Sequence, residues 1–298
     1  MADEMLIDVA LVRRLVAARF PQWAELPVAP VSTQGVDNAT FRLGAEKLVR
    51  LPRYERWVGQ IAREQRWLPR LAPHLPLTVP EPLAVAEPSD DFPFPWSVYR
   101  WLDGERADRA RIADPVAAAV RLARFLVALR GVDATGGPGP EWSNGFRGVG
   151  VDDERDSPIV AWRVEEKITA LAGLVDTDAL RAVWAAGRAA PPWSGRPVWV
   201  HGDPAPGNLL ATDGWLSAVI DFGTLAVGDP ACDLIAAWAF VPRAARDAFR
   251  AAVGLDDATW ARGRVWGLVS ELPPPEALTD AARQRIDELV ADLAASGT

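Results

Sequence analysis

The chain has 298 residues, of which 49% are hydrophobic and 24% charged, a composition that is ordinary for a globular protein. Its length predicts one bilobal domain or two modest ones, and no apolar run approaches the roughly eighteen residues that a membrane-spanning helix needs. The net charge of -8 argues against a general nucleic-acid-binding protein and would suit a cationic small substrate.

The beginning of the chain and its cysteine content indicate a cellular compartment. The segment MADEMLIDVALVRRL is acidic and lacks the basic, apolar and small-residue order of a secretory signal, so we expect a cytoplasmic protein. Cys232 is the single cysteine, which rules out an internal disulfide and a cysteine-rich zinc site. We expect a small molecule as the partner, and neither a membrane nor a nucleic acid.

The first hundred residues predict a small mixed sheet with one intervening helix. After a first helix capped near Asp8, the strand-like segments PVAPVS, ATFRLG and KLVRLP follow, and a turn from Gly44 to Glu46 joins the last two as an antiparallel hairpin. The segment VGQIAREQRWLPRLA is helical in period, and EPLAVAEP and FPWSVYRWL are strand-like.

Beyond residue 103 the pattern is mostly helical. A long helix begins with Asp114 as its cap and Pro115 at its first position, and DLIAAWAFV, PRAARDAFRAAVG, DDATWARGRVWGLV and AARQRIDELVADLAA continue the helical pattern. Residues 131–158 are rich in Gly, Pro and acidic residues, which favours a loop or a loosely ordered insertion. We therefore predict an α+β fold with a first lobe over 1–102 and a larger helical lobe over 103–298.

Two apolar strands in the second half of the chain end in oxygen-bearing side chains. VWVHGD delivers Asp203 at its exit, Asn208 follows in a tight loop, and LSAVIDFG ends with Asp221. We expect the three side chains to converge from neighbouring strand ends. One amide and one carboxylate suit Mg²⁺, which takes few protein oxygens and leaves room for waters and phosphate oxygens. The pattern predicts a magnesium-bound nucleoside triphosphate.

The spacing of these residues is that of a known pair of motifs. D-x-x-x-x-N followed by D-F-G is the arrangement of the protein-kinase catalytic loop and metal-binding motif, with H-G-D here in place of H-R-D. Together with GDPACDL, the segments HGDPAPGN and IDFG closely resemble the aminoglycoside phosphotransferase family, small-molecule kinases with the protein-kinase architecture. The resemblance implies a protein-kinase-like bilobal fold, Mg²⁺ as cofactor, and ATP or GTP as phosphate donor.

The resemblance also implies a role for each motif residue. Asp203 would accept the proton of the substrate hydroxyl, while Asn208 and Asp221 would hold the metal. His201 would pack beneath the metal loop as a strand-end residue, although its place beside the carboxylates also allows a general base. Asp233 would cap a helix or bind the catalytic-loop backbone. Asp229 would shape the following turn.

One carboxylate lies within the apolar stripe of its predicted helix. Glu64 is three residues from Ile61 and four from Leu68, so it shares their face. A buried carboxylate requires a cation, and kinases place one on the third strand, where it also grips the nucleotide phosphates. Lys47 and Arg50 point to opposite faces of that strand. We favour Arg50, which fits the VRLPR pattern of bacterial family members, over its alternative interpretation as a surface arginine.

Two further segments resemble nucleotide-binding parts of these kinases. STQGVDNATF offers Gly35, Asp37 and Asn38, similar to a G-x-D-N turn whose backbone amides approach the phosphates, although by itself it reads as a hairpin. VYRWLDG fits the hinge that connects the lobes. Its backbone would read the adenine edge through the carbonyl near Arg100 and the amide near Leu102.

The acceptor alcohol stays open. An acidic group could line a pocket for a polycationic aminoglycoside, although a solvated acidic loop is the simpler interpretation of Asp152, Asp153, Glu154, Asp156, Glu165 and Glu166. Relatives with the same motifs act on macrolides, choline, homoserine and other small alcohols, so antibiotic resistance is only what the family name suggests.

Two other classes of function compete with a kinase. A non-catalytic nucleotide-binding module should have lost Asp203, Asn208 or Asp221, and all three are present. A metal-dependent hydrolase would explain the carboxylates, but it would not explain Glu64 in an apolar stripe or the strand cation. We therefore expect a small-molecule kinase, a phosphotransferase with an alcohol group as acceptor.

Overall fold

The computed structural model describes four stretches of the chain: residues 6–32, 35, 37–151 and 163–296. The chain divides into two compact units, Met1–Gly104 with Ala218–Gly223, and Glu105–Ser217 with Thr224–Thr298. Among the helices of these described stretches, none combines the length and the apolar character that a membrane crossing needs.

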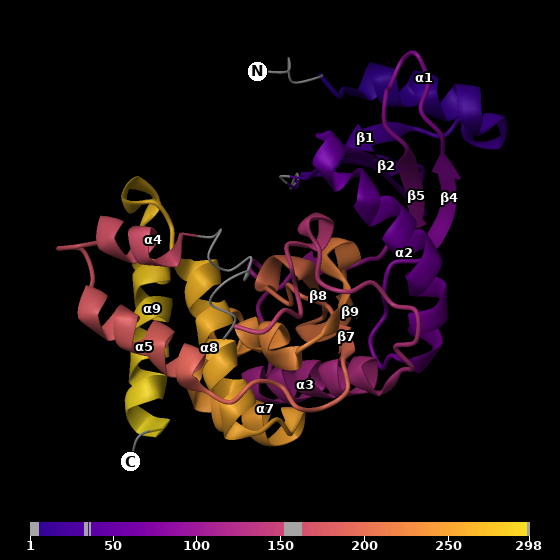
Figure 1. The fold of residues 1–298 in the computed structure, drawn as a ribbon. Helices are drawn as coiled ribbons and strands as arrows, with labels where there is room; N and C mark the ends of the chain where they lie inside the picture. The colour runs from indigo at the N-terminus through magenta and orange to yellow at the C-terminus, as the bar shows by residue number, and fades with distance from the viewer. Residues whose placement is uncertain (1–5, 33–34, 36, 152–162, 297–298) are drawn as a thin grey trace. The chain divides into compact units, whose positions relative to one another are not determined.

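The first unit is built on an antiparallel sheet of five strands (Figure 1). In the order in which they lie side by side, the strands are β1 (Val28–Pro30), β2 (Asn38–Leu43), β3 (Lys47–Pro52), β5 (Trp96–Arg100) and β4 (Pro82–Ala86). β2 and β3 form the predicted hairpin, with Leu43 opposite Lys47 and Asn38 opposite Pro52.

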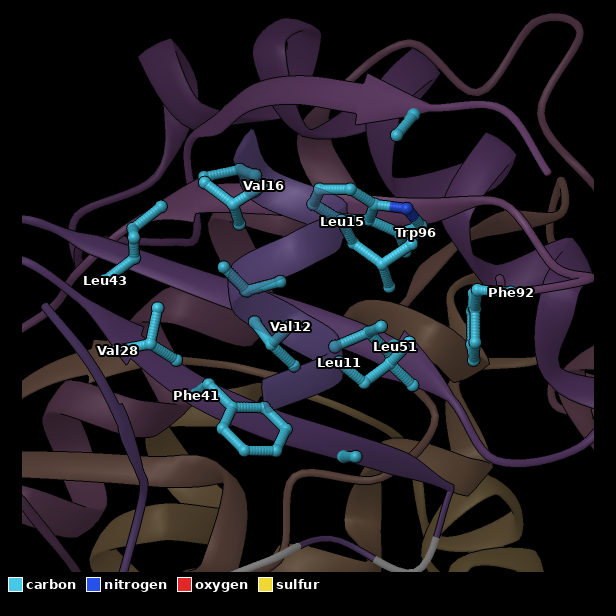
Figure 2. Packing of buried hydrophobic residues seen from close by; sticks show 14 residues of the cluster. Leu11, Val12, Leu15, Val16, Val28, Phe41, Leu43, Leu51, Phe92 and Trp96 are labelled. Carbon is cyan, nitrogen blue, oxygen red and sulfur yellow. The ribbon is translucent and has the colours of Figure 1, made fainter. Parts of the chain in front are cut away.

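One face of this sheet packs on helix α1 (Val9–Arg19), which begins after Asp8. The Asp8 carboxylate accepts a hydrogen bond from the Leu11 amide at 2.8 Å, as the predicted cap requires. Figure 2 shows how apolar side chains of α1 meet every second residue of the strands: Leu11, Val12, Leu15, Val16, Val28, Phe41, Leu43, Leu51 and Trp96. Because side chains alternate along a strand, the residues between them point to the other face.

That other face carries Arg50, Ser97 and Tyr99, and two of these, Arg50 and Tyr99, contact Glu64 of helix α2 (Val58–Leu71). Residues 218–223 join the same unit through Ala218, which forms a parallel bridge with Thr78, and through the Val219 amide, which donates to the Thr78 carbonyl at 2.9 Å. The short segment that contains Asp221 is therefore part of the first unit.

The second unit is mostly helical. Its helices are α3 (Pro115–Gly131), α4 (Val164–Ala170), α5 (Thr177–Ala189), α6 (Ala236–Ala239), α7 (Arg246–Val253), α8 (Asp257–Glu271) and α9 (Asp280–Ser296). Helices α5, α8 and α9 pack together (Figure 1). Its strands are β6 (Glu105–Arg106), β7 (Val198–Val200), β8 (Leu209–Thr212), β10 (Ala226–Gly228) and the beginning of β9 (Trp215–Val219). The predicted α+β class, with a small sheet followed by a mostly helical part, is confirmed, although the sheet expected to be mixed is antiparallel in every pair of its strands.

One predicted helix differs from the structure. DLIAAWAFV forms the end of a 3₁₀ helix, Pro230–Ile235, followed by the single-turn helix α6. All residues from Pro230 to Trp238 are buried, so packing sets their backbone more strongly than helical period does. Residues 132–151 contain a 3₁₀ turn at Trp142–Asn144 but otherwise no helix or strand, in keeping with the predicted loop. The rest of that segment, up to residue 158, lies outside the described residues.

Candidate functional site

An ion-pair cluster lies on the α2 side of the first unit. Nη1 of Arg50 donates to both carboxylate oxygens of Glu64, at 3.0 and 3.1 Å, and Nη2 donates to Oδ1 of Asp221 at 3.0 Å. The Glu64 side chain is 1% exposed and that of Arg50 13%. Lys47 points to the opposite face, where its Nζ lies 5.4 Å from the ring centre of Trp23. Arg50 is thus the strand cation that pairs with Glu64, while its predicted role toward phosphate stays a prediction.

The charge of Arg50 is secured by its neighbours. Burial opposes the charge, but the carboxylates of Glu64 and Asp221 outweigh burial and hold the pKa of Arg50 above its ordinary value. The planar guanidinium can also serve several oxygens at once. This cluster therefore provides a fixed cation, and the Asp221 carboxylate beside it is 42% exposed.

The backbone around Asp221 is unusual. Asp221 has φ +64°, a left-handed conformation that non-glycine residues seldom adopt and that concentrates at functional sites. Two residues on, the Gly223 carbonyl accepts from Nη1 of buried Arg63 at 2.5 Å. A Cβ on Gly223 would lie 2.7 Å from Cδ of Gln60, so a larger residue there would require the Gln60 side chain to move. The D-F-G segment is thus shaped by α2.

Gln60 also links α2 to the predicted phosphate turn. Its side-chain amide is in contact with Asp37, Nε2 to Oδ2 at 3.5 Å, and with Asn38, whose Nδ2 lies 3.4 Å from Oε1. Burial raises the pKa of Asp37, and the like charge of Asp221 adds to the increase. Gly35 is exposed, and a Cβ there would make only ordinary contacts, the nearest at 3.6 Å, so the structure does not require glycine at this position.

The predicted hinge residues continue strand β5. The Arg100 amide donates to the Glu81 carbonyl at 2.9 Å, and its exposed guanidinium pairs with the Glu81 carboxylate at 2.6 Å. Leu102 is half-buried, and its amide donates to no group of the described residues. A free backbone donor fits the predicted role, which stays a prediction.

In the second unit, a buried carboxylate supports the loop that follows β7. Asp233 accepts hydrogen bonds from the amides of His201, at 3.1 Å, and Gly202, at 2.7 Å. Burial raises the pKa of Asp233, against the effect of His201 and the two amides. The His201 ring is buried, and its Nδ1 accepts from the Asp203 amide at 3.2 Å. His201 thus supports the loop backbone.

The glycine of the H-G-D motif has a clear structural cause. Gly202 has φ +88°, and a Cβ on it would lie 2.6 Å from Cγ of Arg147 and 2.8 Å from the Thr224 carbonyl oxygen. The Arg147 side chain packs directly over the backbone at this position. An arginine, which protein kinases carry between the His and the Asp of this motif, could not be accommodated here.

Asp203 and Asn208 form a closed pair. Nδ2 of Asn208 donates to the backbone oxygen of Asp203 at 2.9 Å and to its Oδ2 at 3.0 Å. Because the amide nitrogen faces Asp203, the amide oxygen of Asn208 faces away. Among the described residues, no donor contacts that oxygen or Oδ1 of Asp203.

Asn208 and Asp221, the two predicted metal ligands, belong to different units of the chain. No group of three or more His, Cys, Asp or Glu side chains that could hold a metal occurs among the described residues. The side-chain oxygens of Asn208 and Asp221 are hard ligands of the kind that Mg²⁺ prefers. Their predicted role as metal ligands stays a prediction.

Asp229 anchors the turn after β10 to helix α8. Its carboxylate accepts from the Ala231 amide at 2.9 Å and from Nε of Arg262 at 2.7 Å, and both charged side chains are buried. Arg262 also donates to the Pro191 carbonyl. Sequence reasoning missed Arg262. The available signal was a charged residue between the buried positions Trp260 and Trp266, just as a charged residue within an apolar stripe identified Glu64.

The structure describes only some residues of the predicted acidic group. Asp152, Asp153, Glu154 and Asp156 lie outside the described residues. Glu165 and Glu166, in the first turn of α4, line a shallow hollow with Thr169 and Ala170. Each already has an arginine partner, Arg181 for Glu165 and Arg163 for Glu166. Solvated surface ion pairs account for these two residues.

Three solved structures with the same fold are antibiotic phosphotransferases. APH(2'')-IIia in complex with GDP and kanamycin is 18% identical, with TM-score 0.67, over 95% of this chain and 98% of that one. The streptomycin-ATP-APH(2'')-IIa ternary complex is 17% identical, with TM-score 0.58, over 90% and 91%. Macrolide 2'-phosphotransferase MphH from Brachybacterium faecium is 24% identical, with TM-score 0.59, over 96% and 98%. The predicted kinase-like fold is confirmed.

Sequence comparison decides the family. No curated protein matches the chain. A model of the phosphotransferase enzyme family matches residues 28–266, from β1 into α8, and so covers part of each unit. The resemblance inferred from HGDPAPGN, IDFG and GDPACDL, and the predicted enzyme class, are confirmed: the chain belongs to the phosphotransferase enzyme family.

Proposed function

We propose that the protein is a small-molecule kinase that transfers the terminal phosphate of ATP or GTP to a hydroxyl group of its substrate. The main support is the Arg50 cluster, in which a buried Glu64 fixes a cation next to the half-exposed carboxylate of Asp221. Family membership agrees with this chemistry, and similar structures are complexes with GDP or ATP. In this proposal residues 1–102 bind the nucleotide and residues 103–298 bind the acceptor.

Each residue has a defined task in the proposed reaction. The acceptor oxygen forms a bond to the terminal phosphorus while the bond from that phosphorus to the bridging oxygen breaks, which releases the nucleoside diphosphate. The acceptor proton passes to Oδ1 of Asp203, which Asn208 orients through Oδ2. Arg50 neutralises charge on the phosphate oxygens, as the loose transition state of phosphoryl transfer requires.

Asn208 and Asp221 would hold Mg²⁺ through their side-chain oxygens. When bound, Mg²⁺ supplies positive charge to the phosphate oxygens. Gly35, Asp37 and Asn38 would border the phosphates, and the backbone near Arg100 and Leu102 would read the base.

For the acceptor, we propose the hydroxyl group of an antibiotic, with a small metabolic alcohol of the choline or homoserine type as the alternative. The similar structures support the first choice, since one is a complex with kanamycin, another is a complex with streptomycin, and a third is a macrolide phosphotransferase. The net charge of -8 would suit a cationic acceptor such as an aminoglycoside. Glu165 and Glu166 are already paired with arginines, so the preference for a cationic acceptor rests on the overall charge and not on these two residues.

Two measurements test this function. Thermal denaturation with ATP or GTP should show stabilisation that requires Mg²⁺ and disappears with EDTA, because a ligand that binds only the folded state raises its stability. A coupled assay should then show nucleotide consumption that depends on an added aminoglycoside, macrolide or small alcohol. Absence of any nucleotide-dependent shift would favour a hydrolase. A shift without alcohol-dependent consumption would favour a non-catalytic module.

A further inference from the structure

Tyr99 is in contact with both members of the Arg50–Glu64 pair. It lies on β5, opposite Leu48 of β3, so it shares the face of Arg50, and its hydroxyl donates to Oε2 of Glu64. The centre of its ring lies 5.7 Å from Cζ of Arg50. Tyr99 is 2% exposed, so these contacts are made without competing water.

We propose that Tyr99 is a positioning residue for nucleotide binding, which holds Glu64 through its hydroxyl and thereby keeps Arg50 directed toward Asp221 and the phosphates. The proposal rests on the proposed function, because it assigns to Arg50 a nucleotide contact. Tyr99 itself touches no phosphate in this arrangement and acts through Glu64.

The hydrogen-bond geometry gives the reason. Arg50 uses a single nitrogen, Nη1, for both Glu64 oxygens, and this leaves Nη2 for Asp221. A guanidinium that turns toward a triphosphate weakens its bonds to the buried carboxylate, and an unsatisfied buried oxygen is costly. The Tyr99 hydroxyl satisfies Oε2 independently of Arg50. Arg50 can therefore share its donors with an anion while Glu64 stays in place.

The chemical nature of the donor is also suited to this task. A second cation beside Glu64 would compete with Arg50 for the carboxylate, whereas a neutral hydroxyl does not. Burial and the negative charge of Glu64 hold the pKa of Tyr99 well above its usual range, so the hydroxyl keeps its proton.

The test separates this role from simple packing. Tyr99→Phe removes the hydroxyl and keeps the ring, so we expect the KM for the nucleotide to rise about tenfold, the value for losing one hydrogen bond to a charged group, with the KM for the acceptor unchanged. Tyr54→Phe is the matched control, since Tyr54 is the other tyrosine of the chain and is 40% exposed. It should leave both KM values unchanged.

A double-mutant cycle with Glu64→Gln identifies the pathway of the effect. If Tyr99 acts through Glu64, Tyr99→Phe should change the nucleotide KM by less than about twofold in the Glu64→Gln background. An equal rise in both backgrounds, or no rise in the wild-type background, would overturn the proposal. A wild-type protein that shows no Mg²⁺-nucleotide stabilisation would instead overturn the proposed function, and the role of Tyr99 with it.

Discussion

The Arg50 cluster and the Asp203 loop are assigned parts of one reaction, but they are held in place in opposite ways. In the first unit, Arg50 and Glu64 hold each other by charge, and the same side chains are the proposed functional groups. In the second unit, Asp233 supports the loop through two backbone amides, while Asp203 itself stays half-buried. Function and support coincide in the cluster and are separate in the loop.

This difference determines what a substitution can reveal. Removal of one member of a buried ion pair leaves the other as an uncompensated charge, so loss of activity and loss of stability come together. The Asp203 side chain is half-buried and accepts a hydrogen bond from one side-chain amide, that of Asn208, so its removal should change the structure little. The loop is therefore where catalysis can be measured by itself.

We expect the largest effect on activity from Asp203→Ala. Loss of the proton acceptor should lower kcat about 10²–10⁴-fold, the usual contribution of a general base. The melting temperature and the Mg²⁺-nucleotide shift should stay nearly unchanged, because the Asp203 side chain accepts only from Asn208 among the described residues. Asp247→Ala, an exposed aspartate of the same unit, is the control. Loss of the nucleotide shift would assign Asp203 to binding or folding.

Glu64→Ala should show the opposite behaviour, with stability and nucleotide binding lost together. We expect the free energy of unfolding to fall by about 3 kcal/mol, at the low end for a broken buried pair because Arg50 keeps Asp221 as a partner. Urea denaturation measures the change. Glu81→Ala, which breaks an exposed pair with Arg100, should leave stability unchanged. Equal stability of the two variants would show that the buried pair stabilises the fold no more than the exposed pair does.

Gly202→Ala tests whether the loop depends on its backbone. The Cγ atom of Arg147 can move away from an added methyl group, but the Thr224 carbonyl, 2.8 Å from the Cβ position, cannot. Together with φ +88°, this contact should cost about 1–3 kcal/mol and should lower kcat by displacing Asp203. Gly131→Ala, at the end of α3 where nothing lies within 4 Å, should be harmless. An undisturbed kcat in Gly202→Ala would show that the loop tolerates a shift.

The sequence allowed the parts with local signals to be predicted. The β2–β3 hairpin, the Asp8 and Asp114 caps and the placement of Glu64 on an apolar stripe all depend on residues a few positions apart. The wrong helix over 233–241 shows the limit of this reasoning, because that segment is buried throughout and carries no amphipathic period. Packing then decides the conformation.

The residues that sequence reasoning missed have partners far along the chain. Tyr99 bonds Glu64 across 35 positions, and Arg262 bonds Asp229 across 33. A tyrosine in a strand is ordinary in its own right, so nothing local indicates that its hydroxyl has a charged acceptor. Gln60 is hidden for the same reason, since its contacts to Asp37 and Gly223 join three separate segments. Only the tertiary structure brings such partners together.

Asp37→Asn should have the smallest effect. Its pH dependence tests whether the charges of the first unit stabilise or destabilise the Asp37 carboxylate. Burial, and then the charge of Asp221, raise the pKa of Asp37 above its ordinary value of 3.8. The folded protein therefore binds this proton more tightly than the unfolded chain, and the ionised carboxylate costs stability above the raised pKa.

The amide keeps the contact with Gln60 without the charge, so Asp37→Asn should raise the melting temperature of the nucleotide-free protein at pH 7 by about 1 °C, a small gain because the group is partly solvated. The gain should shrink as the pH falls and vanish below 3.8, where Asp37 is protonated in both states. Thermal denaturation across this pH range measures it. A gain that grows in acid would mean that the Asp37 carboxylate is stabilised in the folded protein, so that the charges of the first unit would attract more than they repel.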